Sequence, residues 1–167
     1  MESKEIRKKA YGHFESGLHC AEVISKTILE LFSEEPQPAV IRSASGFGGG
    51  IGGSTEELCG AFTGGVVALG HLLGRENGGG SLKDCGDMIK KFKQQFMDQF
   101  GSLNCQILLN GFEEEQNPLG CVKLTAETTV ILANLLDGLG LKAGIHPMAI
   151  TGQSKEKLEL GQCPFSA

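Results

Sequence analysis

Four cysteines spread along the chain constrain its fold more than any other feature, because each falls near the start of a segment with helical spacing. They are Cys20, Cys59, Cys105 and Cys121. A helix N-terminus carries partial positive charge and stabilises a thiolate, the form that binds metals and attacks disulfides. No two of the four are close in sequence. A fold that uses them together must therefore gather the ends of separate helices, and we expect such a sulfur site.

Composition limits the class of protein. The chain has 167 residues, enough for one domain with a real core, and its net charge of -5 argues against a general nucleic-acid binder and against attraction to anionic lipid. Residues 1–5 do not resemble a signal peptide, and we expect no apolar run long enough to cross a membrane. The expected compartment is the cytoplasm, where six cysteines point to metal or redox use rather than to structural disulfides.

Apolar residues at helical spacing, interrupted by glycine and proline, predict one all-α domain over residues 1–167, with about six helices in a core of about 4–139. Ser54 with Glu57 predicts a helix that carries Cys59 in its second turn, and Ser81 with Asp84 predicts the start of a long helix. Residues 140–167 are expected to form an irregular tail with a short helical turn near 155–160. No strand pattern is present.

Glycines cluster in two places beside the Cys59 segment. The run at 46–53 cannot be regular helix, and such a loop can cradle a phosphate, but the Gly-Lys-Ser/Thr of a Walker A loop is missing. Gly60 and Gly64 share one helix face with Ala68, which favours close approach by another backbone or by a bound group. The candidate cofactor-contacting residues are Gly49, Gly50, Gly52, Gly53, Gly60 and Gly64.

The cysteine spacing leaves three kinds of chemistry open. Without a C-x-x-C pair, neither a thioredoxin motif nor a zinc ribbon fits, and without C-x-x-C-H we expect no c-type haem. Four thiolates could hold zinc or an iron–sulfur cluster, or two pairs could cycle between thiol and disulfide. The cysteines could also simply pack. Cys85 lies on an apolar stripe and is interpreted as core, and Cys163 receives no role.

A combination of motifs resembles the C_GCAxxG_C_C family, which is named for its cysteine pattern and credited with a redox activity. The matching segments are Cys20-Ala21, residues 47–53, residues 59–64, residues 101–105 and Cys121. The resemblance covers roughly residues 4–139 and implies a small helical domain similar to the non-haem part of split-Soret cytochromes. It places the family's four cysteines at Cys20, Cys59, Cys105 and Cys121. The haem-attachment signature of those cytochromes is missing here, so haem is not implied.

Three hypotheses follow, and each predicts a different arrangement of the sulfurs. An electron-transfer protein with an iron–sulfur cluster, which we favour slightly, requires all four to converge. A metal-free thiol–disulfide protein requires pairs with Cα atoms about 4.4–6.8 Å apart. A non-enzymatic helical binding module allows buried, dispersed sulfurs. Whether the chain is an enzyme stays open. The expected partner is an unidentified redox protein, with no nucleic acid and no membrane, and a homodimer is possible.

Overall fold

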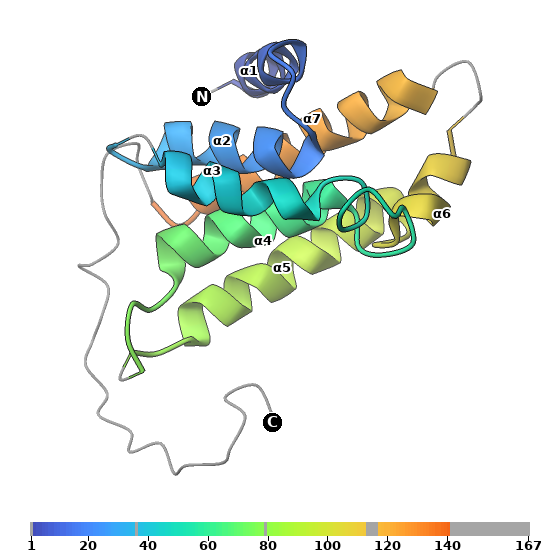
Figure 1. The fold of residues 1–167 in the computed structure, drawn as a ribbon. Coiled ribbons are helices and arrows are strands. Elements are labelled where there is room, and N and C mark those ends of the chain that lie inside the picture. The colour runs from blue at the N-terminus through green and yellow to red at the C-terminus, as the bar shows by residue number, and fades with distance from the viewer. Residues whose placement is uncertain (1, 36, 79, 113–116, 141–167) are drawn as a thin grey trace.

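The computed structural model describes residues 2–140 except 36, 79 and 113–116, and this part of the chain is helical (Figure 1). Its elements, in chain order, are α1 (Ser3–Glu15), α2 (Cys20–Phe32), α3 (Pro38–Ala44), the short 3-10 helix η1 (Ser45–Phe47), α4 (Gly60–Leu73), α5 (Lys83–Phe100), α6 (Cys105–Asn110) and α7 (Asn117–Asp137). Extended pairing within these residues is limited to one isolated bridge between Leu58 and Asn104. The predicted compact all-α fold is confirmed. Cys163 and the turn expected near 155–160 lie outside the described residues.

Helices α2, α4 and α7 form the centre of the bundle. Helix α2 packs against α1, α3, α4 and α7, while α5 covers α4 and α7 from the other side. Helix α1 lies across α2 and α7, and the short α6 lies at the end of the bundle where α7 begins (Figure 1). Helices α2, α4 and α6 each begin at a cysteine or directly after one. The arrangement of the helices therefore decides whether those sulfurs meet.

Phenylalanine rings fill the contact between α4 and α5. The ring of Phe62 stacks on Phe92 with centroids 5.4 Å apart and meets the edge of Phe96 at 5.6 Å. Gly65 makes room for this packing, because a Cβ there would lie 2.5 Å from the Phe92 ring. Burial of three aromatic side chains explains how a chain without tryptophan builds a stable core.

The closest helix contact joins α2 to α4. A Cβ on Gly64 would overlap the carbonyl oxygen of Ala21 and lie 2.6 Å from its Cα. The buried Ser25 hydroxyl donates to the carbonyl of Ala21 at 2.7 Å and also approaches the carbonyl of Gly64 at 2.8 Å. The absence of a side chain at Gly64 therefore lets the backbone of α2 lie close to α4. This contact brings the start of α2, with Cys20, beside the start of α4.

The predicted start of the fourth helix at Ser54 is wrong. Helix α4 begins at Gly60, with Cys59 as its N-cap residue, and residues 48–58 follow an irregular path. Two non-glycine residues of this path, Ile51 (φ 61°) and Thr55 (φ 63°), have left-handed backbone. The segment bonds to the chain before α6: the Cys59 N–H donates to the Leu103 carbonyl at 2.7 Å. These long-range bonds replace the local capping box that Ser54 and Glu57 would have formed.

The other helix ends differ from expectation by a few residues. Helix α5 begins at Lys83, and the Ser81 hydroxyl accepts the Lys83 N–H at 3.1 Å. Gly101 ends α5 in left-handed conformation. Helix α7 begins at Asn117 and ends at Asp137.

One expectation about apolar segments is also wrong. Residues Leu119–Asp137 of α7 are long and apolar enough to cross a membrane, judged by length and composition alone. Over half of the most apolar stretch, 56%, is buried inside the fold, and core helices of soluble proteins meet the same criterion. Helix α7 packs as a core helix does, because it contacts α1, α2, α4 and α5. The absence of a membrane partner stays a prediction.

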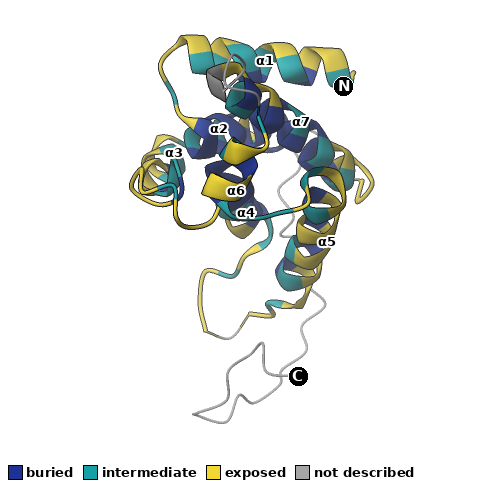
Figure 2. Ribbon diagram, turned by 90° about the vertical axis from the view of Figure 1, so that its right-hand side faces the viewer, coloured by how far each residue is buried: buried dark blue, intermediate teal, exposed yellow. Residues whose placement is uncertain are grey.

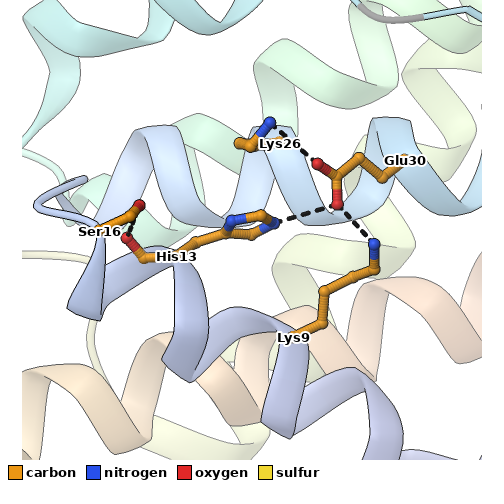
Figure 3. Close-up of polar contacts among 5 residues, drawn as sticks. All are labelled: Lys9, His13, Ser16, Lys26 and Glu30. Atoms are coloured by element: carbon orange, nitrogen blue, oxygen red, sulfur yellow. Dashed lines mark hydrogen bonds and ion pairs between the residues drawn. The ribbon is translucent and has the colours of Figure 1, made fainter.

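Charged side chains join α1 to α2 around Glu30 (Figure 3). The Glu30 carboxylate contacts the ammonium groups of Lys9 at 2.6 Å and Lys26 at 2.9 Å, and the His13 Nε2 at 3.1 Å. Partial burial raises the pKa of Glu30, but these neighbours outweigh it and lower the pKa to about 2. The charged form of Glu30 is therefore favoured by folding.

Removing the charge of Glu30 is expected to make the free energy of unfolding less dependent on pH in acidic solution. Because the folded-state pKa lies below the ordinary value of 4.5, the contribution of Glu30 is complete above about pH 4.5 and is lost as the pH falls towards 2. The side chain is partly exposed, so we expect Glu30→Gln to cost about 1 kcal/mol at pH 7 and progressively less below pH 4.5. A double-mutant cycle with Lys9→Met, measured by urea unfolding from pH 7 to pH 3, isolates the pair. A coupling energy that stays constant with pH would contradict this assignment.

Candidate functional site

The fold places three of the four predicted cysteines at helix N-termini. Cys20 is the first residue of α2, Cys59 is the N-cap of α4, and Cys105 is the first residue of α6. Cys121 is the fifth residue of α7, one turn into that helix. Cys20, Cys59 and Cys105 are buried, whereas Cys121 is partly exposed. All four are free thiols.

The four thiols lie near enough to one another to affect each other's pKa. Cys20 and Cys121 share a side-chain hydrogen bond. Cys121 also interacts electrostatically with Cys59 and Cys105, and Cys20 interacts with both of them as well. Thiols from separate helices therefore influence one another electrostatically, and their use as one site stays a prediction.

Cys20 is the most acidic thiol of the group. The hydrogen bond from Cys121 lowers its pKa, burial opposes this change, and the backbone N–H groups of Gly49 and Ala21 lower it further, to about 6. The Ala21 N–H belongs to the first turn of α2, and the Gly49 N–H comes from the glycine loop. A charge that is desolvated but accepts several hydrogen bonds is stable. Folding therefore favours the thiolate form of Cys20.

Cys121 keeps its proton. Its hydrogen bond to Cys20 raises its pKa well above the ordinary thiol value, and burial and the charge on Cys20 act in the same direction. The two residues share one proton between two sulfurs, and they titrate as a pair. Since Cys121 is the one residue of the four that is not fully buried, the pair combines a stabilised internal thiolate with a protonated thiol on a partly exposed residue.

The other two cysteines are held neutral. Burial raises the pKa of Cys59 to about 12, although the N–H groups of Ala61 and Phe62 oppose the change. Burial also raises the pKa of Cys105, and the charge on Cys20 adds to the effect. Placement at a helix N-terminus is therefore not enough to make a thiolate when the sulfur is buried and a neighbouring sulfur carries charge. Local sequence spacing does not reveal this division.

The candidate glycines differ in how they relate to the sulfurs. A Cβ on Gly60 would overlap the Cys20 Sγ, and one on Gly50 would lie 2.9 Å from the Cys105 Cβ. Gly49 supplies the N–H that reaches Cys20. Gly52 and Gly53 have φ of 63° and 78°, and a Cβ on either would meet nothing within 4 Å. Three of the loop and helix glycines thus adjoin the site, while Gly64 belongs to the α2–α4 contact.

Sequence reasoning missed the residue that fixes Cys105. Asn104 is the N-cap of α6: its side-chain oxygen accepts the Ile107 N–H at 3.0 Å, and its side-chain amide donates to the Glu56 carbonyl at 2.6 Å. The Cys105 N–H donates to the Glu57 carbonyl at 2.8 Å. An asparagine directly before a short apolar run is a capping signal and could have located this start.

Cys85 does not belong to the group of four thiols, and no metal-ligand arrangement is found among the described residues. Cys85 is buried on α5, and this burial raises its pKa. Its Sγ lies 3.8 Å from the carbonyl oxygen of Leu69, and none of the other four thiols shifts its pKa. Across the described residues, no three His, Cys, Asp or Glu side chains are arranged to hold a metal ion. Four thiols suit a soft metal or a cluster by their chemistry, but their side chains are not placed as ligands.

Comparison with known proteins identifies one relationship. The sequence profile of a family described as "Putative redox-active protein (C_GCAxxG_C_C)" matches residues 18–135. This range contains helices α2 to α7 down to Leu135 and all four cysteines of the site, and it leaves out α1. No curated protein and no solved structure matches the chain.

Proposed function

The chain belongs to the C_GCAxxG_C_C family, and on that premise we propose that it is a redox protein whose working couple is the hydrogen-bonded dithiol of Cys20 and Cys121. The observation that carries the proposal is the pairing of an internal thiolate with a partly exposed thiol. Thiol–disulfide exchange needs a nucleophilic sulfur that a substrate can reach and a second sulfur that completes the oxidation.

The first step is attack by Cys121 on a substrate disulfide. As the Cys121 sulfur bonds to one substrate sulfur, its proton passes along the hydrogen bond to the Cys20 thiolate, and the other substrate sulfur leaves as a thiolate. Cys20 is thus the base that activates the nucleophile, in the manner of other nucleophile–base pairs. We assign the attack to Cys121 because Cys20 is buried.

The second step releases the reduced substrate. Cys20 loses its proton to the departing thiolate and attacks the Cys121 sulfur, which frees the second substrate sulfur as a thiolate. The products are one substrate thiol, one substrate thiolate that takes its proton from water, and a Cys20–Cys121 disulfide, so two electrons and one proton move from the protein to the substrate. Cys59 and Cys105 do not enter either step. They line the pair as neutral thiols, which add no further negative charge beside the Cys20 thiolate.

Trapping the intermediate tests the order of the two sulfurs. With Cys20 replaced by serine, oxidised glutathione is expected to leave a stable glutathione adduct on Cys121, because the resolving thiol is missing. With Cys121 replaced by serine, little adduct is expected on the buried Cys20. Mass spectrometry of the intact protein and its peptides reads both results. An adduct that forms on Cys20 in the second variant and not on Cys121 in the first would reverse the assignment.

An iron–sulfur cluster is the second candidate, and one observation favours it: four thiols from four helices interact with one another. Cys20, Cys59, Cys105 and Cys121 would be its ligands, and the cluster would supply one-electron transfer. In this reading the helix N-termini at Cys20 and Cys105 would offset part of the accumulated negative charge.

The cluster candidate has its own test. Protein purified without oxygen is expected to contain stoichiometric iron and acid-labile sulfide, and Cys59→Ser is expected to lose most of both, because it removes one of four ligands. Cys85→Ser, the matched change at a thiol outside the group, should retain them. Full iron content in the Cys59→Ser protein, or no iron in the parent, would remove this candidate and leave the dithiol alone.

A further inference from the structure

Most of the large apolar side chains that remain exposed in the described residues lie on the segments that carry or lead into Cys59, Cys105 and Cys121. In the described part of the chain, such side chains with 40–60% exposure are Ile51, Leu58, Ile107, Leu119 and Leu139. Leu58 directly precedes Cys59, Ile107 follows Cys105 by two positions, and Leu119 precedes Cys121 by two. Exposed apolar residues scattered singly need no explanation, but a group at one functional site indicates contact with a partner.

Backbone bonds hold these residues on neighbouring segments. Leu58 pairs with Asn104 in the isolated bridge, and the Thr55 carbonyl accepts the Gln106 N–H at 2.8 Å. The segment with Ile51 and Leu58 is thereby fixed beside α6, and α6 packs against α7, which carries Leu119 and Cys121. Figure 2 looks onto this end of the molecule, where α6 shows a largely exposed surface. We call Ile51, Leu58, Ile107 and Leu119 the apolar rim.

The charge beside the apolar rim is mainly negative. Glu56 and Glu57 are exposed, and segments 46–58 and 101–112 contain no other charged residue. Their backbone carbonyls, not their carboxylates, bond to Asn104 and Cys105. Lys123 is exposed on the neighbouring turn of α7. The loop and α6 together therefore offer apolar contacts with two carboxylates and no cation.

We infer that the apolar rim with Glu56 and Glu57 docks a protein whose disulfide is flanked by apolar and basic side chains. The inference rests on the proposed dithiol function. Electrostatic complementarity favours such a partner, because Lys or Arg beside the disulfide would meet the two carboxylates. A second copy of this chain fits less well, since a symmetric contact would bring the glutamates of both copies together and would cover Cys121 in each.

Two short peptides with matched sequences serve as probes of this preference. Each contains one cysteine joined to thionitrobenzoate by a disulfide, with leucine on one side and either two lysines or two glutamates on the other. Attack by Cys121 on the peptide sulfur breaks the S–S bond, transfers the Cys121 proton to Cys20 and releases coloured thionitrobenzoate. All proteins are full-length and contain Cys163→Ser, which removes a thiol that could react separately.

At low salt we expect the lysine peptide to react about tenfold faster than the glutamate peptide, and the ratio to fall towards one at about 0.5 M salt. Glu56→Gln with Glu57→Gln should reduce the ratio to about twofold without changing the rate with the small uncharged disulfide of thiopyridine. Ile107→Ser should slow both peptides and spare the small disulfide. Glu2→Gln with Glu5→Gln, the same charge change on α1, should leave the ratio intact.

The outcomes separate this inference from the proposed function. Equal rates for the two peptides, with normal reaction of the small disulfide, would overturn the docking surface and leave the dithiol in place. Loss of preference in the α1 control as well would show an effect of net charge alone and would also overturn it. No Cys121-dependent reaction with any of the three disulfides would overturn the dithiol function, and the docking surface with it.

Discussion

The Cys20→Ser variant is expected to react with the small aromatic disulfide of thionitrobenzoate about 100-fold more slowly than its parent at pH 7. The reason is that Cys121 loses the thiolate that accepts its proton, and a serine hydroxyl is not a base at this pH. Stopped-flow absorbance measures the rate in a Cys163→Ser background. Cys85→Ser removes a buried thiol outside the pair and is the matched control, with an expected rate close to that of the parent.

The pH dependence of the same reaction identifies the base. Because the pKa of Cys20 is about 6, the parent's rate should reach a plateau above about pH 7 and fall about tenfold per unit below pH 6, where Cys20 is protonated. In Cys20→Ser the plateau should disappear, and the rate should continue to rise into alkaline solution as Cys121 ionises alone. A plateau that survives the substitution would show that another group activates Cys121.

The Gly64→Ala substitution is expected to destabilise the protein by about 3 kcal/mol, the upper end of the cost of overpacking. The new methyl group would overlap the carbonyl oxygen and the Cα of Ala21. A backbone cannot move aside by changing a rotamer, so α2 and α4 would have to separate and Ser25 would lose its bridge between them. Urea unfolding followed by circular dichroism measures the change.

Gly70 on the same helix provides the matched control. It is exposed, and a Cβ there would meet nothing within 4 Å, so Gly70→Ala should gain about 0.5 kcal/mol from helix propensity. The two substitutions add the same methyl group to the same helix and are expected to have opposite signs. Equal effects of the two would show that α2 and α4 are not in close contact at Gly64.

The sequence predicted helices well where the signal was local. The glycine that ends α5 at Gly101 and the apolar stripes of the long helices depend on neighbouring residues, and the structure contains them. The start of α4 was predicted wrongly because Ser54 and Glu57 match a capping box, while the actual partners of this segment are Leu103 and Cys105, almost fifty residues away. Pairing over that distance leaves no trace in local spacing.

The sequence indicated which cysteines could form the candidate site, but it did not indicate which of their thiols is ionised. Four cysteines near helix starts suggested a shared sulfur site, and the thiols do interact. The difference between a Cys20 thiolate and a neutral Cys59 depends on which sulfur receives hydrogen bonds from Cys121, Gly49 and Ala21. Those donors come from three separate segments, so their convergence is a property of the fold. Exposure of Cys121 alone among the four is likewise set by tertiary packing.

Disulfide mapping after oxidation shows which two sulfurs form the working couple. Protein purified without oxygen is treated with oxidised glutathione, free thiols are alkylated, and the peptides are identified by mass spectrometry. The proposed dithiol mechanism predicts a single linkage between Cys20 and Cys121, with Cys59, Cys85 and Cys105 alkylated. A linkage between Cys59 and Cys105 with Cys20 and Cys121 both alkylated, or four unlinked cysteines after complete treatment, would contradict it.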